Sequence, residues 1–378
     1  MKTKEKGQKI TRRGFLKTAA VGGAVATTLG VPYFAKHASA APITIQMQSM
    51  WDAGTIGYVI FEKWCKYVSE ASDGKLILKS LPAGSVVGTF EMFDAVKGGT
   101  LDAMYSSDTY HVGKIAVATF LSSYPFGMDR PDQWDVWFGE LGGKEMAREA
   151  YAEQNMYWLG PIQHDDNLIH SKVPIRSFEE FKGKKIRFPG GIIADIFRSA
   201  GVATVLLPGG EVYPALEKGV IDAADFVGAA INYNLGFGEI AKYIIMGPPS
   251  TPCLHQPVDL HCIGINMRVW KSLPKHMQDF MEMAVREYSF RQYTGIQKAD
   301  LQAFEDFQKK QGVTVVRLKD SDIEKFKKFA PELWVKYAKR HPLAMRAFKS
   351  QWEFMKSVKV GYYKESDFVD PQGKKLTL

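Results

Sequence analysis

A short pattern occurs twice in the chain, about 120 residues apart, and it constrains the fold more than any other feature. Residues 93–103 align with residues 213–223: an Ala, a Gly, an Asp and a final Ala coincide, and aromatic and aliphatic positions correspond. Each copy has the pattern of a helix, a glycine stop and a buried strand. Two such units predict two lobes with similar α/β plans.

The segments around the first copy alternate between strand and helix patterns. We predict strands at residues 43–47, 76–81 and 101–105, and helices at residues 58–72 and 91–97. This alternation is typical of a parallel or mixed sheet with crossover helices. The predicted fold class is therefore α/β.

The second lobe is predicted to begin near Pro161. Residues 177–180 have the spacing of a capping box before a short helix, and a strand at 186–188 leads into a Pro-Gly-Gly turn. From 273 to about 310 the chain has few helix breakers, and a helix of that length spans roughly 50 Å. Such a helix can lie across both lobes. A strand at 313–318 and helices over 321–358 close the chain.

The first 40 residues have the pattern of an export signal. Arg12 and Arg13, followed by Gly-Phe-Leu-Lys, form a twin-arginine pattern, and an apolar stretch at 19–31 is too short to span a bilayer. Ala38 and Ala40 flank Ser39 in a small-residue cleavage site. We predict twin-arginine export to the periplasm and cleavage near Ala40. The alternative is a basic tail before an ordinary helix.

Most of the net positive charge of the chain lies in this segment. The whole chain carries +8, of which residues 1–40 supply +7, so the mature part is near +1. The basic balance is therefore no indication of nucleic-acid binding. About 338 residues remain, enough for two domains. We assign 41–160 to lobe I, completed by part of 253–320, and 161–252 to lobe II, completed by part of 321–378.

Motifs of catalysis and of metal binding are absent from the sequence. There is no G-x-S-x-G, H-E-x-x-H, P-loop, G-x-G-x-x-G or C-x-x-C pattern. The three cysteines, Cys65, Cys253 and Cys262, allow at most one disulfide. The sequence therefore favours binding without chemistry.

Arg187 is the strongest candidate for a binding residue. It lies on an apolar strand directly before a Pro-Gly-Gly turn, where a buried guanidinium needs an anionic partner. Its planar fork fits a carboxylate, either of a ligand or of a structural salt bridge. Asp225 ends the strand of the second repeat, beside Phe226. Ligands of open α/β sheets bind at such strand ends, although an Asp there can also cap a helix.

Two histidines are weaker candidates. His164 precedes Asp165 and Asp166, and carboxylates can orient an imidazole or share a metal with it. The alternatives are a solvated loop and a structural hydrogen bond. His255 lies in a proline-rich segment and is a candidate for facing a ligand.

The chain resembles the extracytoplasmic solute-binding subunits of tripartite ATP-independent periplasmic (TRAP) transporters, of the DctP type. The resemblance extends from Ile43 to the C-terminal helices. Its specific segments are residues 70–76, 93–100, 124–127, 181–188, 213–224, and 235–237 followed by 241–243. It implies a two-lobed periplasmic binding fold with a long helix bridging both lobes. It also implies a small and a large integral membrane subunit as partners, and it is compatible with a dimer.

The family resemblance also implies site residues. In the family, an arginine at the position of Arg187 binds the ligand's carboxylate, and the branch for 2-oxo and 2-hydroxy acids has a Glu-Trp pair where this chain has Asp225 and Phe226. A Gln of that branch falls here among Asp165, Asp166 and Asn167. A further Glu has no clean match, so His255 or Gln256 could face the cleft. Trp51, Ser107 and Tyr110 are the candidates for the opposite wall.

These residues predict a function and its rivals. We expect a periplasmic protein that binds a small organic acid anion, a 2-oxo or 2-hydroxy carboxylate, with no required cofactor. A sodium or calcium ion held by Asp225 and Gln256 could accompany the acid. The rival class is a cofactor-dependent enzyme exported in folded form, and a second rival is a binding subunit that serves a sensor or another transporter.

Overall fold

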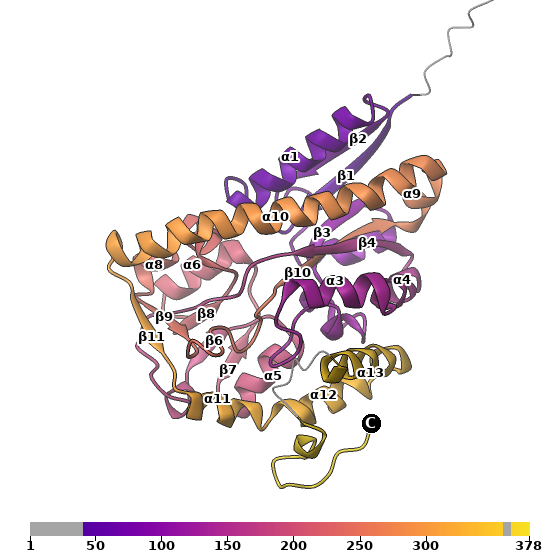
Figure 1. Ribbon diagram of the computed structural model, residues 1–378. Helices are drawn as coiled ribbons and strands as arrows, with labels where there is room; N and C mark the ends of the chain where they lie inside the picture. The colour runs from indigo at the N-terminus through magenta and orange to yellow at the C-terminus, as the bar shows by residue number, and fades with distance from the viewer. Residues whose placement is uncertain (1–40, 358–363) are drawn as a thin grey trace, which may run out of the picture. The chain divides into compact units, whose positions relative to one another are not determined.

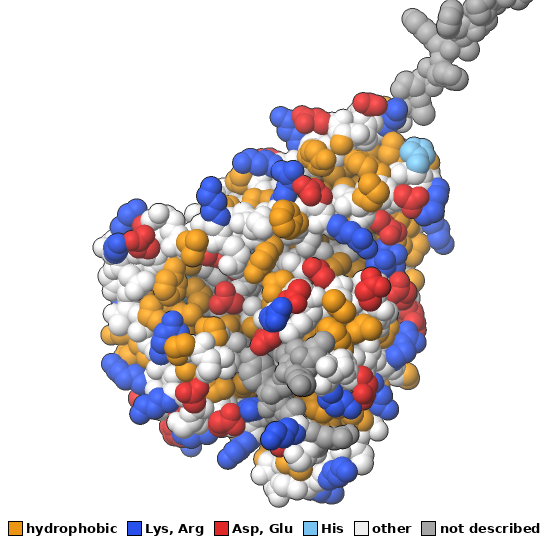
Figure 2. Space-filling model, in the orientation of Figure 1, with side chains coloured by type: hydrophobic (Ala, Val, Ile, Leu, Met, Phe, Trp, Pro, Cys, Tyr) orange, Lys and Arg blue, Asp and Glu red, His pale blue; other side chains and the backbone are white. Residues whose placement is uncertain are grey.

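The computed structural model describes residues 41–357 and 364–378. The predicted export signal at 1–40 lies outside these residues. The described chain contains two separate mixed sheets, surrounded by helices (Figure 1). Among its helices, none is both long and apolar enough to pass through a bilayer. Acidic and basic side chains are interspersed over the face in Figure 2, as expected from the small net charge of residues 41–378.

The first sheet has five strands in the order β2-β1-β3-β10-β4. Strand β10 runs antiparallel to both of its neighbours, whereas β1 is parallel to β2 and β3. The strands are β1 (Ile43–Ser49), β2 (Leu76–Leu81), β3 (Ala103–Ser107), β4 (Met156–Gln163) and β10 (Leu260–Asn266). The predicted strands at 43–47, 76–81 and 101–105 are confirmed to within two residues.

The second sheet has six strands in the order β11-β9-β5-β8-β6-β7. Here β5 is the strand that runs antiparallel to both of its neighbours, β8 and β9. The strands are β5 (Ile169–Ser171), β6 (Lys185–Arg187), β7 (Ala203–Val205), β8 (Ala223–Asp225), β9 (Tyr243–Met246) and β11 (Thr314–Arg317). Within residues 253–320, β10 therefore belongs to the first sheet and β11 to the second, while the lobe limits remain a prediction.

The two copies of the repeat occupy equivalent places in the two sheets. Helix α2 (Met92–Gly98) precedes β3, and helix α6 (Gly209–Glu217) precedes β8. Gly99 and Gly219 end the two helical turns at φ values of 82° and 70°, a left-handed conformation that favours glycine. Each strand has a parallel neighbour on one side and an antiparallel one on the other. The two-lobe prediction from the repeat is confirmed.

Helix α10 (Lys275–Lys309) joins the two halves and confirms the predicted bridging helix. It packs on β4 and α1 (Ile56–Ala71) beside the first sheet and on α7 (Ala229–Asn234) beside the second. The Trp64 indole of α1 donates to Ala284 O at 2.9 Å. Near the other end of the helix, Asp300 Oδ1 accepts from Ala230 N at 2.6 Å. The chain crosses between the sheets at 164–168 and again at 247–259.

The remaining helices cover the outer faces. They are α3 (Pro131–Glu140), α4 (Gly143–Ala152), α5 (Gly191–Ser199), α8 (Phe237–Ile240), α9 (Met267–Ser272), α11 (Asp320–Lys327), α12 (Ala330–Ala338) and α13 (Pro342–Ser357). Helix α12 packs on α5 and α13 packs on α4, so the C-terminal helices contact both halves.

Two local expectations are resolved by the structure. The capping box at residues 177–180 is wrong: the Glu180 carboxylate accepts from Arg176 N at 2.9 Å, and the helix is a single 3-10 turn at Glu179–Phe181. Cys65, Cys253 and Cys262 are all buried and free.

Candidate ligand-binding site

Arg187 ends strand β6 with its guanidinium almost fully buried, at 1% exposure. Its Nε donates to Leu207 O at 3.0 Å, and Nη1 donates to Asp225 O at 2.9 Å. The side chain also lies 4.9 Å over the Phe226 ring, a favourable place for a cation. These contacts fix the fork in one orientation, because β6 and β8 are neighbours and end at the same sheet edge.

The Asp225 carboxylate lies between two nitrogen donors. Oδ2 is 3.4 Å from Arg187 Nη1, and Oδ1 is 2.7 Å from His255 Nε2. Burial lowers the pKa of His255, but Cys253 and Asp225 beside it outweigh burial, so its pKa is raised. The three side chains form a buried chain in which the carboxylate is held by a guanidinium and an imidazole.

Tyr110 meets Arg187 from the first lobe. It lies in the 3-10 turn Asp108–His111, directly after β3, and its hydroxyl accepts from Arg187 Nη2 at 3.2 Å. Burial raises the pKa of Tyr110, although Arg187 acts in the opposite direction, so the phenol stays protonated at neutral pH. The ends of β3 and β6 therefore face each other across the gap between the sheets.

A small cavity lies at this junction and brings together most of the predicted site residues. Seven of its lining residues were candidates from the sequence: Trp51, Ser107, Tyr110, Asn167, Arg187, Phe226 and Gln256. They come from both halves of the molecule, as a two-lobed binding cleft requires. Asn167 leaves its buried Oδ1 without a partner among the described residues, while its Nδ2 donates to Gln256 Oε1 at 3.0 Å.

Three predicted residues do not line this cavity. Asp225 and His255 lie behind its wall, fully buried and bound to each other. Asp166 lines a different pocket, together with Pro257 and Tyr293. The structure therefore places Asp166 outside this cavity, and its role in binding stays a prediction.

Asp259 and His261 line the cavity and were missed by the sequence analysis. The Asp259 carboxylate accepts from His261 Nε2 at 3.1 Å and from Gln256 Nε2 at 2.5 Å. Burial opposes ionisation of Asp259, but the imidazoles of His261 and His164 outweigh it and lower its pKa. Their i, i+2 spacing at the start of β10 was the available signal, since such residues share one face of a strand.

His164 and Asp165 form a buried pair at the first crossing between the sheets, with His164 Nδ1 bonded to Asp165 Oδ1. The solvated alternative for this pair is wrong, and the structural hydrogen bond is confirmed. Burial lowers the pKa of His164 to about 4. Asp300 of α10 lies beside Asp165, and burial together with that carboxyl raises the pKa of Asp300 to about 9.

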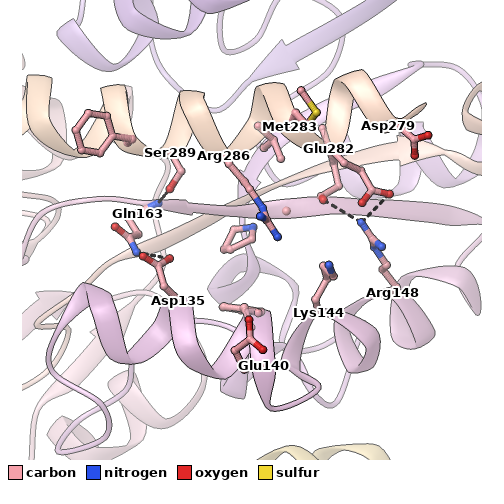
Figure 3. A pocket seen from close by; sticks show the side chains of 17 residues that line it. Asp135, Glu140, Lys144, Arg148, Gln163, Asp279, Glu282, Met283, Arg286 and Ser289 are labelled. Carbon is pink, nitrogen blue, oxygen red and sulfur yellow. Dashed lines mark hydrogen bonds and ion pairs between the residues drawn. The ribbon is translucent and has the colours of Figure 1, made fainter. Parts of the chain in front are cut away.

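A larger groove of about 580 Å³ lies elsewhere, between α3, α4, β4 and α10 (Figure 3). Within it, Arg148 pairs with Glu282 at 3.1 Å, and Gln163 donates to Asp135 at 2.7 Å. The groove holds no buried cation comparable to Arg187, so the smaller cavity is the candidate ligand site.

Comparison with known proteins agrees with this architecture. The family model for bacterial extracellular solute-binding proteins, family 7 (DctP), matches residues 47–340. A monocarboxylate 2-oxoacid-binding periplasmic protein of Nostoc sp. is 29% identical over 285 residues, covering 74% of this chain and 76% of the relative.

Two solved structures have the same fold. A TRAP transporter solute-binding protein from Bordetella bronchiseptica, a mixed-occupancy dimer with calcium and picolinate in its occupied site, has a TM-score of 0.77 and 25% identity, covering 84% of this chain and 93% of that one. An apo open TRAP periplasmic solute-binding protein from Rhodobacter sphaeroides has a TM-score of 0.64 and 26% identity, covering 85% and 100%.

The two-lobed α/β fold and the family match make this chain a solute-binding protein. The chain belongs to family 7 of the bacterial extracellular solute-binding proteins, the DctP family. This confirms the resemblance and the fold class inferred from the sequence. The matches give no support to the rival of a cofactor-dependent enzyme.

Proposed function

We propose that this protein captures a small organic acid anion in the cavity between its lobes, with Arg187 as the group that binds the carboxylate. The observation that carries the proposal is the buried guanidinium, held rigidly at a strand end and directed into a cavity lined from both lobes. A guanidinium is suited to a carboxylate because it is planar, permanently charged and carries several N–H donors. Since Nε and Nη1 are bonded to Leu207 O and Asp225, Nη2, which donates to Tyr110, is the nitrogen available to the acid.

Closure of the lobes is the accompanying conformational step. The turn of the second lobe carrying Gly190 packs against the first lobe, where a Cβ on Gly190 would lie 2.9 Å from Val112 and 3.3 Å from Thr109 O. Together with the Arg187–Tyr110 bond, this contact belongs to the closed form. A ligand that contacts both lobes shifts the population toward that form.

A 2-oxo or 2-hydroxy monocarboxylate is the ligand class we favour. The Nostoc relative is named for 2-oxoacid monocarboxylates. The cavity measures only about 10 Å³ in this structure, so the acid has to enter while the lobes are apart. Ser107 supplies a hydroxyl, and Asn167 Oδ1 supplies an acceptor that no described residue satisfies. These groups suit the second polar substituent of such an acid, beside the carboxylate at Arg187.

Delivery to a membrane transporter completes the proposed role. We propose export by the twin-arginine route with cleavage near Ala40, residence in the periplasm, and transfer of the acid to the small and large integral subunits of a TRAP transporter. The Bordetella relative belongs to such a system and forms a dimer, which makes a dimer the first oligomer to test here.

A thermal-shift screen of the mature protein, unfolded and refolded to remove bound ligand, tests this function. The panel holds 2-oxo acids, 2-hydroxy acids, dicarboxylates, sugar acids and aromatic acids. A ligand that binds only the folded state raises the melting temperature by mass action. A shift with the small 2-oxo or 2-hydroxy acids is expected. No shift with any acid, for protein shown to be folded, would contradict the proposal.

A further inference from the structure

The oxygen atoms around the cavity determine whether a metal ion can accompany the acid. Calcium accompanies picolinate in the Bordetella relative, and the sequence allowed sodium or calcium at Asp225 and Gln256. Hard cations take several oxygen ligands, carboxylates foremost, and calcium takes six to eight. The fit therefore depends on which oxygens at this junction are free of nitrogen donors.

Asp225 is a poor ligand for a cation in this chain. Both of its oxygens face nitrogen donors, His255 Nε2 at 2.7 Å and Arg187 Nη1 at 3.4 Å. It is fully buried and does not line the cavity. A metal ion at this carboxylate would lie next to the guanidinium charge and would have to displace the imidazole, which costs electrostatic energy in a buried site.

The other carboxylate and amide side chains of the cavity are also committed to partners. Asp259 accepts from Gln256 and from His261 through its two oxygens, and Gln256 Oε1 accepts from Asn167. Among these carboxylate and amide oxygens only Asn167 Oδ1 remains, a neutral oxygen, beside the hydroxyls of Ser107, Thr109 and Tyr110. Within residues 41–357 and 364–378, no group of three or more His, Cys, Asp and Glu side chains is placed to hold a metal. The residues present therefore do not fit a sodium or calcium ion.

We infer that this protein binds its acid without a metal ion, because His255 occupies the Asp225 carboxylate and Arg187 alone supplies the positive charge that meets the anion. His255 acts as a positioning residue: it holds Asp225, and Asp225 with its backbone carbonyl holds the guanidinium. The inference rests on the proposed function.

Calorimetric titration under three ionic conditions tests the inference. Pyruvate, lactate and 2-oxobutyrate are each titrated into refolded mature protein in tetramethylammonium buffer with EDTA, then with sodium chloride, then with calcium chloride. Affinities that agree within about twofold are expected. Binding that tightens by about tenfold or more, equivalent to about 1.4 kcal/mol, with either cation would overturn the inference while leaving the proposed function intact. No binding under any condition would contradict the proposed function, and the inference with it.

Variants at His255 separate positioning from a purely structural role. His255→Ala removes the imidazole from Asp225 Oδ1, so we expect weaker binding in EDTA that calcium partly restores, by about fivefold or more. His255→Gln retains an N–H donor and should stay independent of cations, which keeps the test valid if the alanine variant does not fold. His276→Ala, an exposed change on α10, is the matched control. Weaker binding of His255→Ala with no calcium response would contradict the role assigned to His255.

Discussion

Arg187 Nη2 donates to the hydroxyl of Tyr110 at 3.2 Å, although the two side chains come from different sheets. Arg187 ends β6 of the second sheet, and Tyr110 follows β3 of the first. The bond can form only when the two lobes lie together. The residue proposed to bind the anion is thus also a contact of the closed form, which couples ligand binding to closure.

Replacing Tyr110 with phenylalanine tests this coupling. The variant keeps the ring contact with Phe90, at 5.1 Å between centroids, and removes only the hydroxyl that accepts from Arg187. A hydrogen bond to a charged group contributes about 1.5–3 kcal/mol, so we expect acid affinity to fall by about tenfold to a hundredfold. Calorimetry measures the change. Tyr67→Phe, at a half-exposed tyrosine on α1, is the control. Equal affinities of Tyr110→Phe and the unmodified protein would remove Tyr110 from the site.

Replacing Gly190 with valine tests closure itself. The added side chain would meet Val112 and Thr109 of the opposite lobe, whereas the φ of −72° at Gly190 is accessible to any residue. We therefore expect each lobe to stay folded and acid affinity to drop by about tenfold or more, because the clash opposes the closed form. Small-angle X-ray scattering with ligand should show a larger radius of gyration than for the unmodified protein.

Gly139→Val is the matched control for this experiment, since nothing lies within 4 Å of a Cβ at Gly139. It should bind acid normally and close normally. A Gly190→Val variant that compacts on ligand addition as the unmodified protein does would show that this contact is no part of closure.

The raised pKa of Asp300 predicts that the protein becomes less stable as the pH rises toward alkaline values. Its folded-state pKa of about 9 lies above the ordinary value of 3.8, so between these two values the folded state holds a proton that the unfolded state has released. The free energy of unfolding therefore falls as pH rises through this window, by up to about 1.4 kcal/mol per pH unit for one group. His164 and Asp165 are its titratable neighbours.

The variant Asp300→Asn should remove part of this decline. Asparagine keeps an oxygen for Ala230 N and carries no charge, so we expect it to exceed the unmodified protein in stability by about 1–3 kcal/mol at pH 8 and to match it near pH 4. Denaturant unfolding at both pH values measures the difference. Asp306→Asn is the control: Asp306 is partly buried on the same helix, and Lys310 lowers the pKa of its carboxyl, so this variant should not be more stable at pH 8. A variant less stable than the unmodified protein at pH 8 would show that Asp300 is ionised there.

The sequence predicted much of the fold because several elements carry local signals. The repeat at 93–103 and 213–223 located a helix and a strand in each lobe, and the lack of breakers after Pro274 located α10 to within two residues. The predicted capping box at Ser177 is wrong because the Glu180 carboxylate accepts from a different backbone donor, Arg176 N. Local spacing alone does not decide between competing hydrogen-bond partners.

The site was predicted less completely, since its geometry depends on contacts between distant segments. Arg187 stood out as a charge on an apolar strand, and the structure places it at the cavity. Asp259 and His261 reach the same cavity because β10 lies beside β3, a pairing that nothing in the local sequence indicates. His255 lies behind the wall because Asp225 comes between it and Arg187.

The most direct test of the central claim is calorimetric titration of Arg187→Lys with the acid that gives the largest thermal shift. Lysine keeps the positive charge and loses the planar fork, and breaking a buried charged pair of this kind costs about 2–5 kcal/mol. Arg291→Lys, an exposed change on α10, is the control. We predict that Arg187→Lys folds normally and binds the acid at least about 100-fold more weakly, while the control is unchanged. Equal affinity of Arg187→Lys and the unmodified protein would contradict the assignment of Arg187 as the carboxylate-binding residue.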